Sequence, residues 1–184
     1  MKKQNIIMNR KFNHGFTLME LLVTMAIAAI LVSMAVPSFQ AFFSRNRIAT
    51  VTNDFMSSIN FARSEAVKGG AITTMCMMST SLVNTCSTTN TGWSNGWIIW
   101  VDRNGDSTMQ ASELLRSHGP INAGNVAIGG TQIAFSFAGQ GALTTTTDTF
   151  NICTPTDLKL SNSITIAPSG QLRRVAKPSL ATCP

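Results

Sequence analysis

One short stretch has the spacing of a serine nucleophile. Gly92-Trp93-Ser94-Asn95-Gly96 matches G-x-S-x-G, in which a sharp turn between a strand and a helix exposes the serine hydroxyl. Here a polar loop precedes the serine and an apolar, strand-like run follows it, so the required turn is missing. His118 is the one histidine left after residue 15. We therefore interpret the stretch as a turn into a strand and expect no enzymatic activity.

A second stretch has the oxygen spacing of a calcium-binding loop. Its side-chain oxygens fall at loop positions one, three, five and twelve, which such a loop uses as ligands. They belong to Asp102, Asn104, Asp106 and Glu113. Ser107 stands where the glycine of the sharp turn belongs, and the flanking residues read as strands rather than helices. A turn between strands is the favoured interpretation, calcium binding is the alternative, and no cofactor is expected.

Four cysteines could form disulfides. They are Cys76, Cys86, Cys153 and Cys183. An even number in an exported domain favours disulfides, and the spacings fit no C-x₂-C zinc pattern. Three pairings are possible, and proximity in the sequence favours Cys76–Cys86 with Cys153–Cys183. The second bridge would close a loop worth roughly 3–4 kcal/mol in the loop-entropy model.

The charge is unevenly distributed along the chain. The net charge is +6, but four of the fourteen basic residues precede residue 15, which leaves ten basic and eight acidic residues, or +2. The pI near 9.6 therefore does not by itself indicate nucleic-acid binding. After Asp157 there is no acidic residue, and a cluster of basic residues could contact phosphates. The cluster consists of Lys159, Arg173, Arg174 and Lys177.

All of these residues follow a long apolar segment near the N-terminus. Residues 16–36 form an apolar run in which Glu20 is the only charge. A helix of that length spans roughly 30 Å, the thickness of a hydrocarbon core. The basic residues before it favour a cytoplasmic N-terminus, and its length exceeds that of a cleaved secretory signal. An unpaired Glu20 would cost roughly several kcal/mol in lipid, which implies a partner.

The helix is expected to continue outside the membrane. Pro37 should bend it, because proline lacks an N–H and clashes with the preceding turn. Beyond it, apolar residues recur at steps of three and four, which predicts one buried stripe. The stripe consists of Ile48, Val51, Phe55, Ile59, Ala62 and Ala66. Lys68 followed by Gly69-Gly70 predicts the helix end.

From residue 71 the composition indicates an antiparallel β domain. Threonine, serine, asparagine and glycine separate short apolar runs. The expected strands are 71–78, 96–101, 113–117, 125–128, 132–137, 149–153, 163–167 and 171–176. The runs from Ile133 to Gly139-Gln140 and from Ile164 to Gly170-Gln171 predict two similar hairpins.

Three tryptophans lie in or near one predicted strand. Trp97 and Ile99 would share one face, and Ile98 and Trp100 the other, with Trp93 just before the strand. A strand that is apolar on both faces lies between two layers or exposes an interaction patch. We favour the core.

The N-terminal segment resembles the class III signal of type IV pilins and type II secretion pseudopilins. Gly15-Phe16-Thr17-Leu18-Met19-Glu20 carries the resemblance, together with Pro37. It implies that a prepilin peptidase cuts between Gly15 and Phe16 and that Phe16 is then N-methylated. It also implies assembly with other major and minor pilins or pseudopilins, in which Glu20 neutralises the N-terminal amine of a neighbouring subunit.

The rest of the chain resembles the GspH/FimT family of minor pilins and pseudopilins. The supporting stretches are 60–66, 96–102 with Asn104-Gly105-Asp106, 135–139 and Ser169-Gly170. The resemblance implies a pilin-like α+β fold, with a long N-terminal helix packed on an antiparallel sheet. The expected organisation is a leader (1–15), a transmembrane and assembly helix (16–36), an amphipathic extension (37–68) and a periplasmic domain (71–184).

The function that the resemblance implies is a minor pilin or pseudopilin. Such a subunit would reside in the inner membrane and then in the fibre, which it would help to initiate or cap. FimT-type members bind DNA through a Gly-Arg-x-Arg motif, which here reads Gly170-Gln171-Leu172-Arg173. The alternative function is therefore a receptor for double-stranded DNA that uses Arg173, Arg174 and Lys177. Adjacent strand residues point to opposite faces, so Arg173 and Arg174 share a groove only if the strand has ended.

Overall fold

The computed structural model describes residues 15–82, 84–90, 92–122, 126–155, 157–176, 178 and 183, without the side chains at 35–38 and 157. The chain divides into two compact units, residues 1–41 and 42–184, and each is described by itself. Helix α1, Leu18–Gly69, contributes to both. Of the expected leader, Gly15 alone lies among the described residues.

The described part of the first unit is the beginning of α1. Thr17 caps the helix, because its Oγ1 accepts a hydrogen bond from Glu20 N and its carbonyl oxygen accepts one from Leu21 N, both at 3.2 Å. The hydroxyls of Thr24 and Ser33 donate to backbone carbonyls one turn earlier. The helix thus satisfies these three hydroxyl groups itself, as a bilayer interior requires.

The predicted bend at Pro37 stays a prediction. Backbone helix continues through this residue, but its side chain lies outside the described part of the chain.

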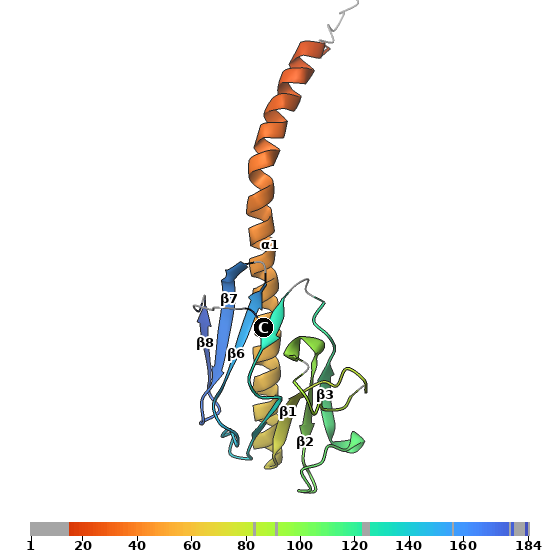
Figure 1. The fold of residues 1–184 in the computed structure, drawn as a ribbon, viewed down its shortest axis with the longest axis vertical. Coiled ribbons are helices and arrows are strands. Elements are labelled where there is room, and N and C mark those ends of the chain that lie inside the picture. The colour runs from red at the N-terminus through yellow and green to blue at the C-terminus, as the bar shows by residue number, and fades with distance from the viewer. Residues whose placement is uncertain are drawn as a thin grey trace, which may run out of the picture. The chain divides into compact units, whose positions relative to one another are not determined.

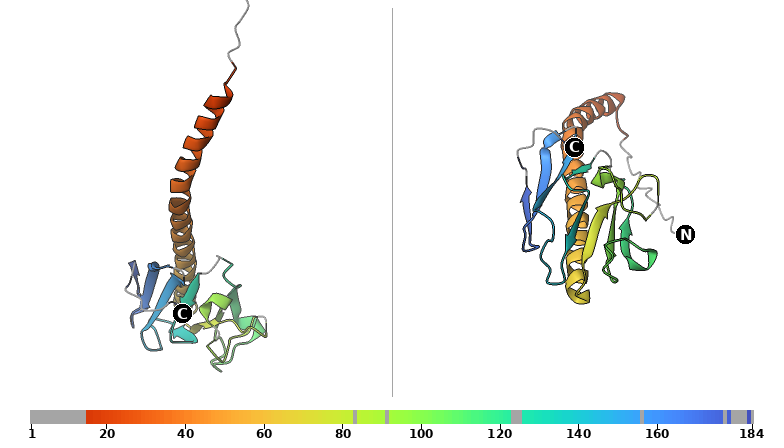
Figure 2. Two further views of the ribbon diagram at one scale, coloured as in Figure 1. Left: turned by 45° about the horizontal axis from the view of Figure 1, so that its top comes forward. Right: turned by 60° about the horizontal axis from the view of Figure 1, so that its bottom comes forward.

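In the second unit, α1 presents the predicted apolar stripe to two β-sheets. Figures 1 and 2 show the strands on either side of this part of the helix. Every member of the stripe is buried, with an exposed fraction of 5% or less. The prediction that this stripe forms core is confirmed.

All eight predicted strands are present, and every pair is antiparallel. The first sheet has the order β3-β2-β1-β5 and the second β4-β6-β7-β8. The bounds are β1 Thr73–Met77, β2 Trp97–Val101, β3 Leu114–His118, β4 Ala127–Gly129, β5 Ala134–Phe137, β6 Asp148–Thr154, β7 Asp157–Ile166 and β8 Leu172–Ala176.

Strand β7 begins six residues before the predicted 163, because its polar first half pairs with β6 and was not recognisable as an apolar run. Two short 3₁₀ helices, η1 Trp93–Asn95 and η2 Ala111–Glu113, were not predicted.

The core is centred on Phe55 of α1. Its ring lies 5.1 Å from those of Trp97 and Phe150 and 5.5 Å from that of Trp93, in edge-to-face contacts. Strand β2 lies between two layers, as predicted. Trp97 and Ile99 join this core, whereas Ile98 and Trp100 pack with Cys76 on the other face. The three tryptophans are therefore core residues.

Two similar hairpin turns follow β5 and β7. In each, an i→i+3 backbone hydrogen bond closes the turn, from Gly141 N to Ala138 O and from Gly170 N to Ala167 O. Both glycines have positive φ, +80° and +76°, which non-glycine side chains rarely adopt. The predicted hairpin of β7 and β8 is confirmed. The turn after β5 leads to an isolated bridge between Phe137 and Leu143 rather than to a second strand, and the glycine that matches Gly170 is Gly141 rather than Gly139.

Candidate functional site

The predicted cleavage site lies just before α1. Gly15, Phe16 and Thr17 have no helical structure, and no atom outside its chain neighbours would lie within 4 Å of a Cβ on Gly15. Phe16 is 81% exposed. The bond between Gly15 and Phe16 is thus in irregular, accessible backbone, the kind of segment that proteases cut.

Glu20 lies in the first turn of α1 with an exposed side chain. A carboxylate there is stabilised by the partial positive charge of the helix N-terminus. Among the described residues, none forms an ion pair with Glu20. A partner for this charge would have to come from outside the described part of the chain.

Large apolar side chains cover the described part of the first unit on all sides. Twelve of them, from Phe16 to Met34, are 46–81% exposed. The helix is long and apolar enough to cross a membrane, with a mean hydropathy of 2.3 over its most apolar window, none of which is buried. A helix that is hydrophobic all round requires a lipid or protein environment.

Both predicted disulfides are formed. Cys76 and Cys86 have Cα atoms 5.6 Å apart, and Cys153 and Cys183 have Cα atoms 5.9 Å apart. The first bridge fixes the loop after β1 against the outer face of the first sheet. The second joins strand β6 to the C-terminal tail.

The structure supports the interpretation of Ser94 as a turn residue. Its Oγ accepts a hydrogen bond from Ile128 N at 2.8 Å, which joins η1 to β4. The ring of His118 instead stacks on Trp97, with centroids 4.0 Å apart, and its Nδ1 lies 2.8 Å from Gly119 O. No hydrogen bond links Ser94 with His118, so the two do not form a nucleophile–base pair.

The carboxylates of the calcium-like loop hold the loop itself together. Asp102 accepts hydrogen bonds from Gly105 N at 2.7 Å and from Ser107 N at 3.0 Å. Glu113 accepts from the backbone N–H groups of Arg103 at 2.9 Å and Gln110 at 3.2 Å. In the same loop, Asp106 accepts from Thr108 N and from the side chains of Asn104 and Gln110. This is the geometry of a turn closed by its own side chains, the interpretation that the sequence favoured.

The predicted basic cluster is divided between two faces of its sheet. Strand β8 continues to Ala176, so Arg173 and Arg174 point to opposite sides. In the β7–β8 register Arg174 lies opposite the buried Ile164, on the side that faces α1, whereas Arg173 lies opposite Thr165. Lys177 lies outside the described residues.

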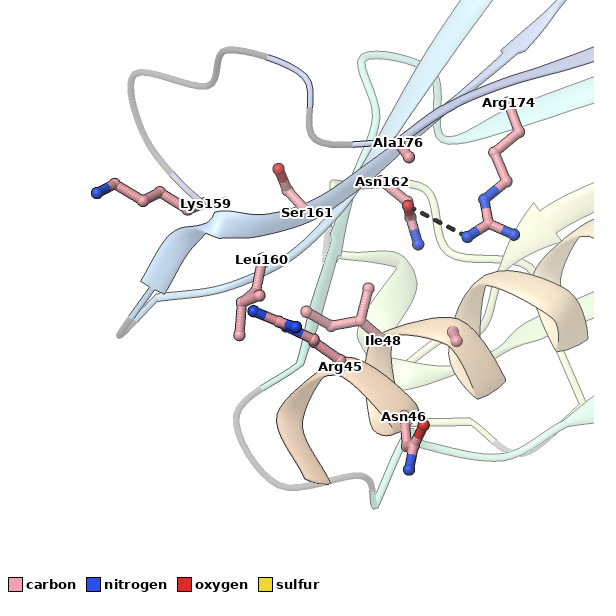
Figure 3. Close-up of a pocket in the computed structure, with 10 residues that line it drawn as sticks. Arg45, Asn46, Ile48, Lys159, Leu160, Ser161, Asn162, Arg174 and Ala176 are labelled. Carbon is pink, nitrogen blue, oxygen red and sulfur yellow. Dashed lines mark hydrogen bonds between the residues drawn. The ribbon is translucent and has the colours of Figure 1, made fainter. Parts of the chain in front are cut away.

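Arg174 instead lines a groove of about 300 Å³ that the sequence analysis missed (Figure 3). The groove is lined by Arg45, Asn46, Ile48 and Ala49 of α1, by Lys159, Leu160, Ser161 and Asn162 of β7, and by Arg174 and Ala176 of β8. Arg174 Nη2 donates to Asn162 Oδ1 at 3.4 Å, and Asn162 Nδ2 donates to Thr52 Oγ1 at 2.9 Å. No local pattern in the sequence indicates that Arg45 and Arg174 line the same groove, because 129 positions separate them.

Two known family models match parts of the chain. Residues 51–170 match the family described as type II transport protein GspH, and residues 10–36 match the prokaryotic N-terminal methylation motif. The chain belongs to the GspH family. The methylation motif includes Gly15, Phe16 and Glu20.

This GspH-family protein has the fold of a solved type IV minor pilin. Two crystal structures of Pseudomonas aeruginosa FimU resemble it with TM-scores of 0.61 and 0.57, at 20% and 19% identity. The matches cover 77% and 73% of this chain and, in both cases, 98% of the FimU chain. No curated protein matches the chain.

The GspH-family assignment fixes the general class of function. The chain is a minor pilin or pseudopilin of a type IV pilus or type II secretion system, with the predicted pilin-like α+β fold. Proteins of this class are structural rather than enzymatic, and they assemble with other pilins after processing by a prepilin peptidase.

Proposed function

We propose that the chain is a low-copy subunit that helps to initiate or cap a type IV pilus or a type II secretion pseudopilus. Its precursor resides in the inner membrane, with the N-terminus in the cytoplasm and the β domain in the periplasm. The prepilin peptidase removes residues 1–15 and methylates Phe16. The new N-terminus, just before α1, then enters the fibre together with this helix.

The observation that carries this proposal is the unpartnered apolar surface of α1 before residue 42. A side chain such as Leu31, 64% exposed in the isolated chain, gains free energy on transfer to lipid or to a protein interface. The methylation motif covers the beginning of the same segment. The resemblance to pilins implies that such helices pack together in a fibre. Membrane anchoring and assembly are therefore successive uses of one surface.

Glu20 supplies the specificity of that packing. A carboxylate buried among apolar helices is strongly unfavourable unless it is paired, because its charge loses its hydration. Processing creates a new positive charge at the amine of Phe16, four positions earlier. In the fibre, the amine of one subunit pairs with Glu20 of its neighbour, so that helices in a wrong register leave both charges unpaired.

The experiment that tests this role compares Glu20→Ala with Glu65→Ala in the chain's own host. Glu65 is the matched control, since it lies on the same helix and pairs with the exposed Lys68 at 3.4 Å. Fibres are sheared from cells, and the subunit in them is quantified against the membrane fraction. We expect Glu20→Ala to reduce incorporation at least tenfold and Glu65→Ala to leave it unchanged. Equal incorporation of both variants would contradict the proposed pairing.

A specific role in initiation predicts where the subunit lies and what its loss does. Deletion of the gene should lower the number of fibres per cell more than their length, and labelled subunits should be found at one fibre end. Labels distributed along the fibre would contradict this part of the proposal.

The alternative, a DNA receptor, would have to use Arg173 or Arg174 separately, since they lie on opposite faces of β8. A short DNA duplex titrated at several salt concentrations tests it. Binding that falls steeply with salt, and that is lost on replacing Arg173, Arg174 and Lys177, would favour the receptor. Affinity unchanged by these replacements would exclude this site.

A further inference from the structure

The groove beside β8 collects positive charge from two elements. Arg45 comes from α1 and Arg174 from β8, and both are exposed, whereas Figure 3 shows the side chain of Lys159 of β7 pointing away from them. Among the side chains that the structure describes, no carboxylate lines it. The hydrogen bond from Arg174 to Asn162 leaves the other guanidinium donors of Arg174 available, because arginine has five. The groove therefore attracts an anion, and its arginines favour a phosphate or carboxylate.

The interior of the same groove is apolar. Figure 3 shows Ile48 and Leu160 between Arg45 and the sheet, with Ala176 further along. A ligand that fits both parts is an anionic amphiphile, whose charged group meets the arginines while its apolar part covers the aliphatic side chains. A small inorganic anion would leave that surface exposed.

One of the groove residues, Arg45, lies close in the sequence to the predicted membrane span. Arg45 follows Val36, the last residue of the apolar run, by nine positions, or about 14 Å if helical. The headgroup layer is roughly 6 Å thick on each side of the hydrocarbon core. Helical side chains lean towards the N-terminus, so the long side chain of Arg45 reaches back over part of that distance.

The residues between the membrane span and Arg45 are also of the types found at a membrane surface. Phe39, Phe42 and Phe43 lie between Val36 and Arg45 and are 56–60% exposed. Positive charges close to a membrane span are under-represented on the exported side, yet between Glu20 and Asp54 the only charged residues are Arg45 and Arg47. We interpret the two arginines at this position as residues that bind a ligand near the membrane surface.

We propose that the groove of Arg45 and Arg174 binds the headgroup of an anionic phospholipid in the outer leaflet of the inner membrane. The inference rests on the proposed anchoring of α1 and adds a ligand for the second unit. Bound lipid holds the β domain against the bilayer while the subunit waits for assembly, and extraction into the fibre breaks the contact. DNA is the disfavoured ligand, because bases and sugars do not match the apolar interior.

The test uses the full chain in neutral detergent micelles, titrated with phosphatidylglycerol or phosphatidylcholine. Native mass spectrometry counts the lipid that stays bound. The groove variant is Arg45→Gln with Arg174→Gln. Its charge-matched control is Arg47→Gln with Arg173→Gln. Arg47 lies two residues from Arg45 on α1, and Arg173 lies next to Arg174 on β8. Both are exposed, and neither lines the groove.

We expect one phosphatidylglycerol to bind in preference to phosphatidylcholine. The groove variant should lose about 25-fold in affinity, the product of two roughly fivefold contacts, and the control should lose less than about twofold. Arg45→Gln alone should lose about fivefold, a check that does not disturb the bond between Arg174 and Asn162.

Three results would overturn the proposal. They are equal losses in the groove and control variants, no preference for the anionic lipid, and displacement of the lipid by a short DNA duplex at equal concentration. Resistance of the protein to carbonate extraction from its own membranes reports anchoring independently. Lost lipid preference with intact anchoring would remove the groove site alone, whereas failed anchoring would remove the proposed function.

Discussion

Arg63 Nε donates a hydrogen bond to the carbonyl oxygen of Gly141 at a distance of 2.9 Å. The same guanidinium donates through Nη2 to Ser169 O at 3.1 Å. Gly141 belongs to the hairpin turn after β5, and Ser169 to the turn between β7 and β8. The two turns also bond to each other, from Leu143 N to Pro168 O at 2.9 Å. One helical side chain thus fastens the turns of both sheets to α1.

Replacing Arg63 with alanine should destabilise the second unit. The variant leaves two carbonyl acceptors without their charged donor, and the expected loss is about 2 kcal/mol, or roughly 6 °C in Tm. Arg63→Lys should recover part of this, because lysine keeps the charge but cannot bridge both carbonyls with a planar fork. Thermal unfolding of the full chain in detergent measures the effect. Arg47→Ala, at an exposed position of the same helix, is the control and should leave Tm unchanged. A similar Tm for all variants would contradict the fastening role.

Gly105 and Gly170 have nearly the same φ angle but differ in the space around them. Alanine substitutions at the two positions therefore distinguish the cost of backbone strain from the cost of a steric clash. Gly105 has φ +75° and open space around a Cβ, whereas Gly170 has φ +76° and would place a Cβ 2.9 Å from Arg63 Nε and against the backbone of Gly141. Gly105→Ala should therefore lose about 1 kcal/mol through the left-handed conformation. Gly170→Ala should lose at least about 2 kcal/mol more, because it also overpacks the contact between the two turns. Urea unfolding of both variants measures the difference, and equal losses would refute the tight packing of the turns.

The sequence predicted well those features that local periodicity encodes. The stripe from Ile48 to Ala66 and the alternation of Trp97 with Ile98 depend on side-chain spacing within one element, and both were confirmed. The partners of Arg63 and the groove around Arg45 were missed. These contacts depend on which strands become neighbours and in which register, and no spacing within α1 contains that information.

The first half of β7 shows the same limit in a strand. Residues 157–162 are mostly polar, so periodicity gave no signal, yet they pair with β6 and place Asn162 against Thr52 of α1. Conversely, the calcium-like spacing of Asp102 and Glu113 gave a pattern that local turn bonding explains. Spacing identifies which groups could meet, and the backbone around them decides what they bind.

The two disulfides should contribute unequally to stability. They separate paired residues by 10 and by 30 positions, and a longer closed loop removes more entropy from the unfolded chain. Replacing Cys153 and Cys183 with serine should therefore cost about 1 kcal/mol more than replacing Cys76 and Cys86. Chemical unfolding of both double variants under oxidising conditions tests the order. A larger loss for the shorter loop would show that packing around Cys76, rather than loop entropy, dominates.

Alanine substitutions at two phenylalanines of α1 should affect different properties, one the stability of the fold and the other assembly into fibres. Phe55 is fully buried, and Phe55→Ala should lose about 3–5 kcal/mol through the cavity it leaves. Phe43 is 56% exposed, and Phe43→Ala should change the stability of the isolated chain by less than about 0.5 kcal/mol. Its effect should appear instead as reduced recovery in sheared fibres. Unfolding curves and fibre recovery for both variants decide this, and a destabilised Phe43→Ala would contradict the exposed placement of Phe43.

The intact mass and N-terminal sequence of the protein, purified from its own membranes without reductant, test the account most directly. We predict a chain that begins at N-methylated Phe16 and whose mass is four hydrogens below the free-thiol value, as two disulfides require. That result would establish pilin processing and both bridges in one measurement. A chain that begins at Met1 would contradict processing and assembly, and the protein would then be a membrane-anchored β domain.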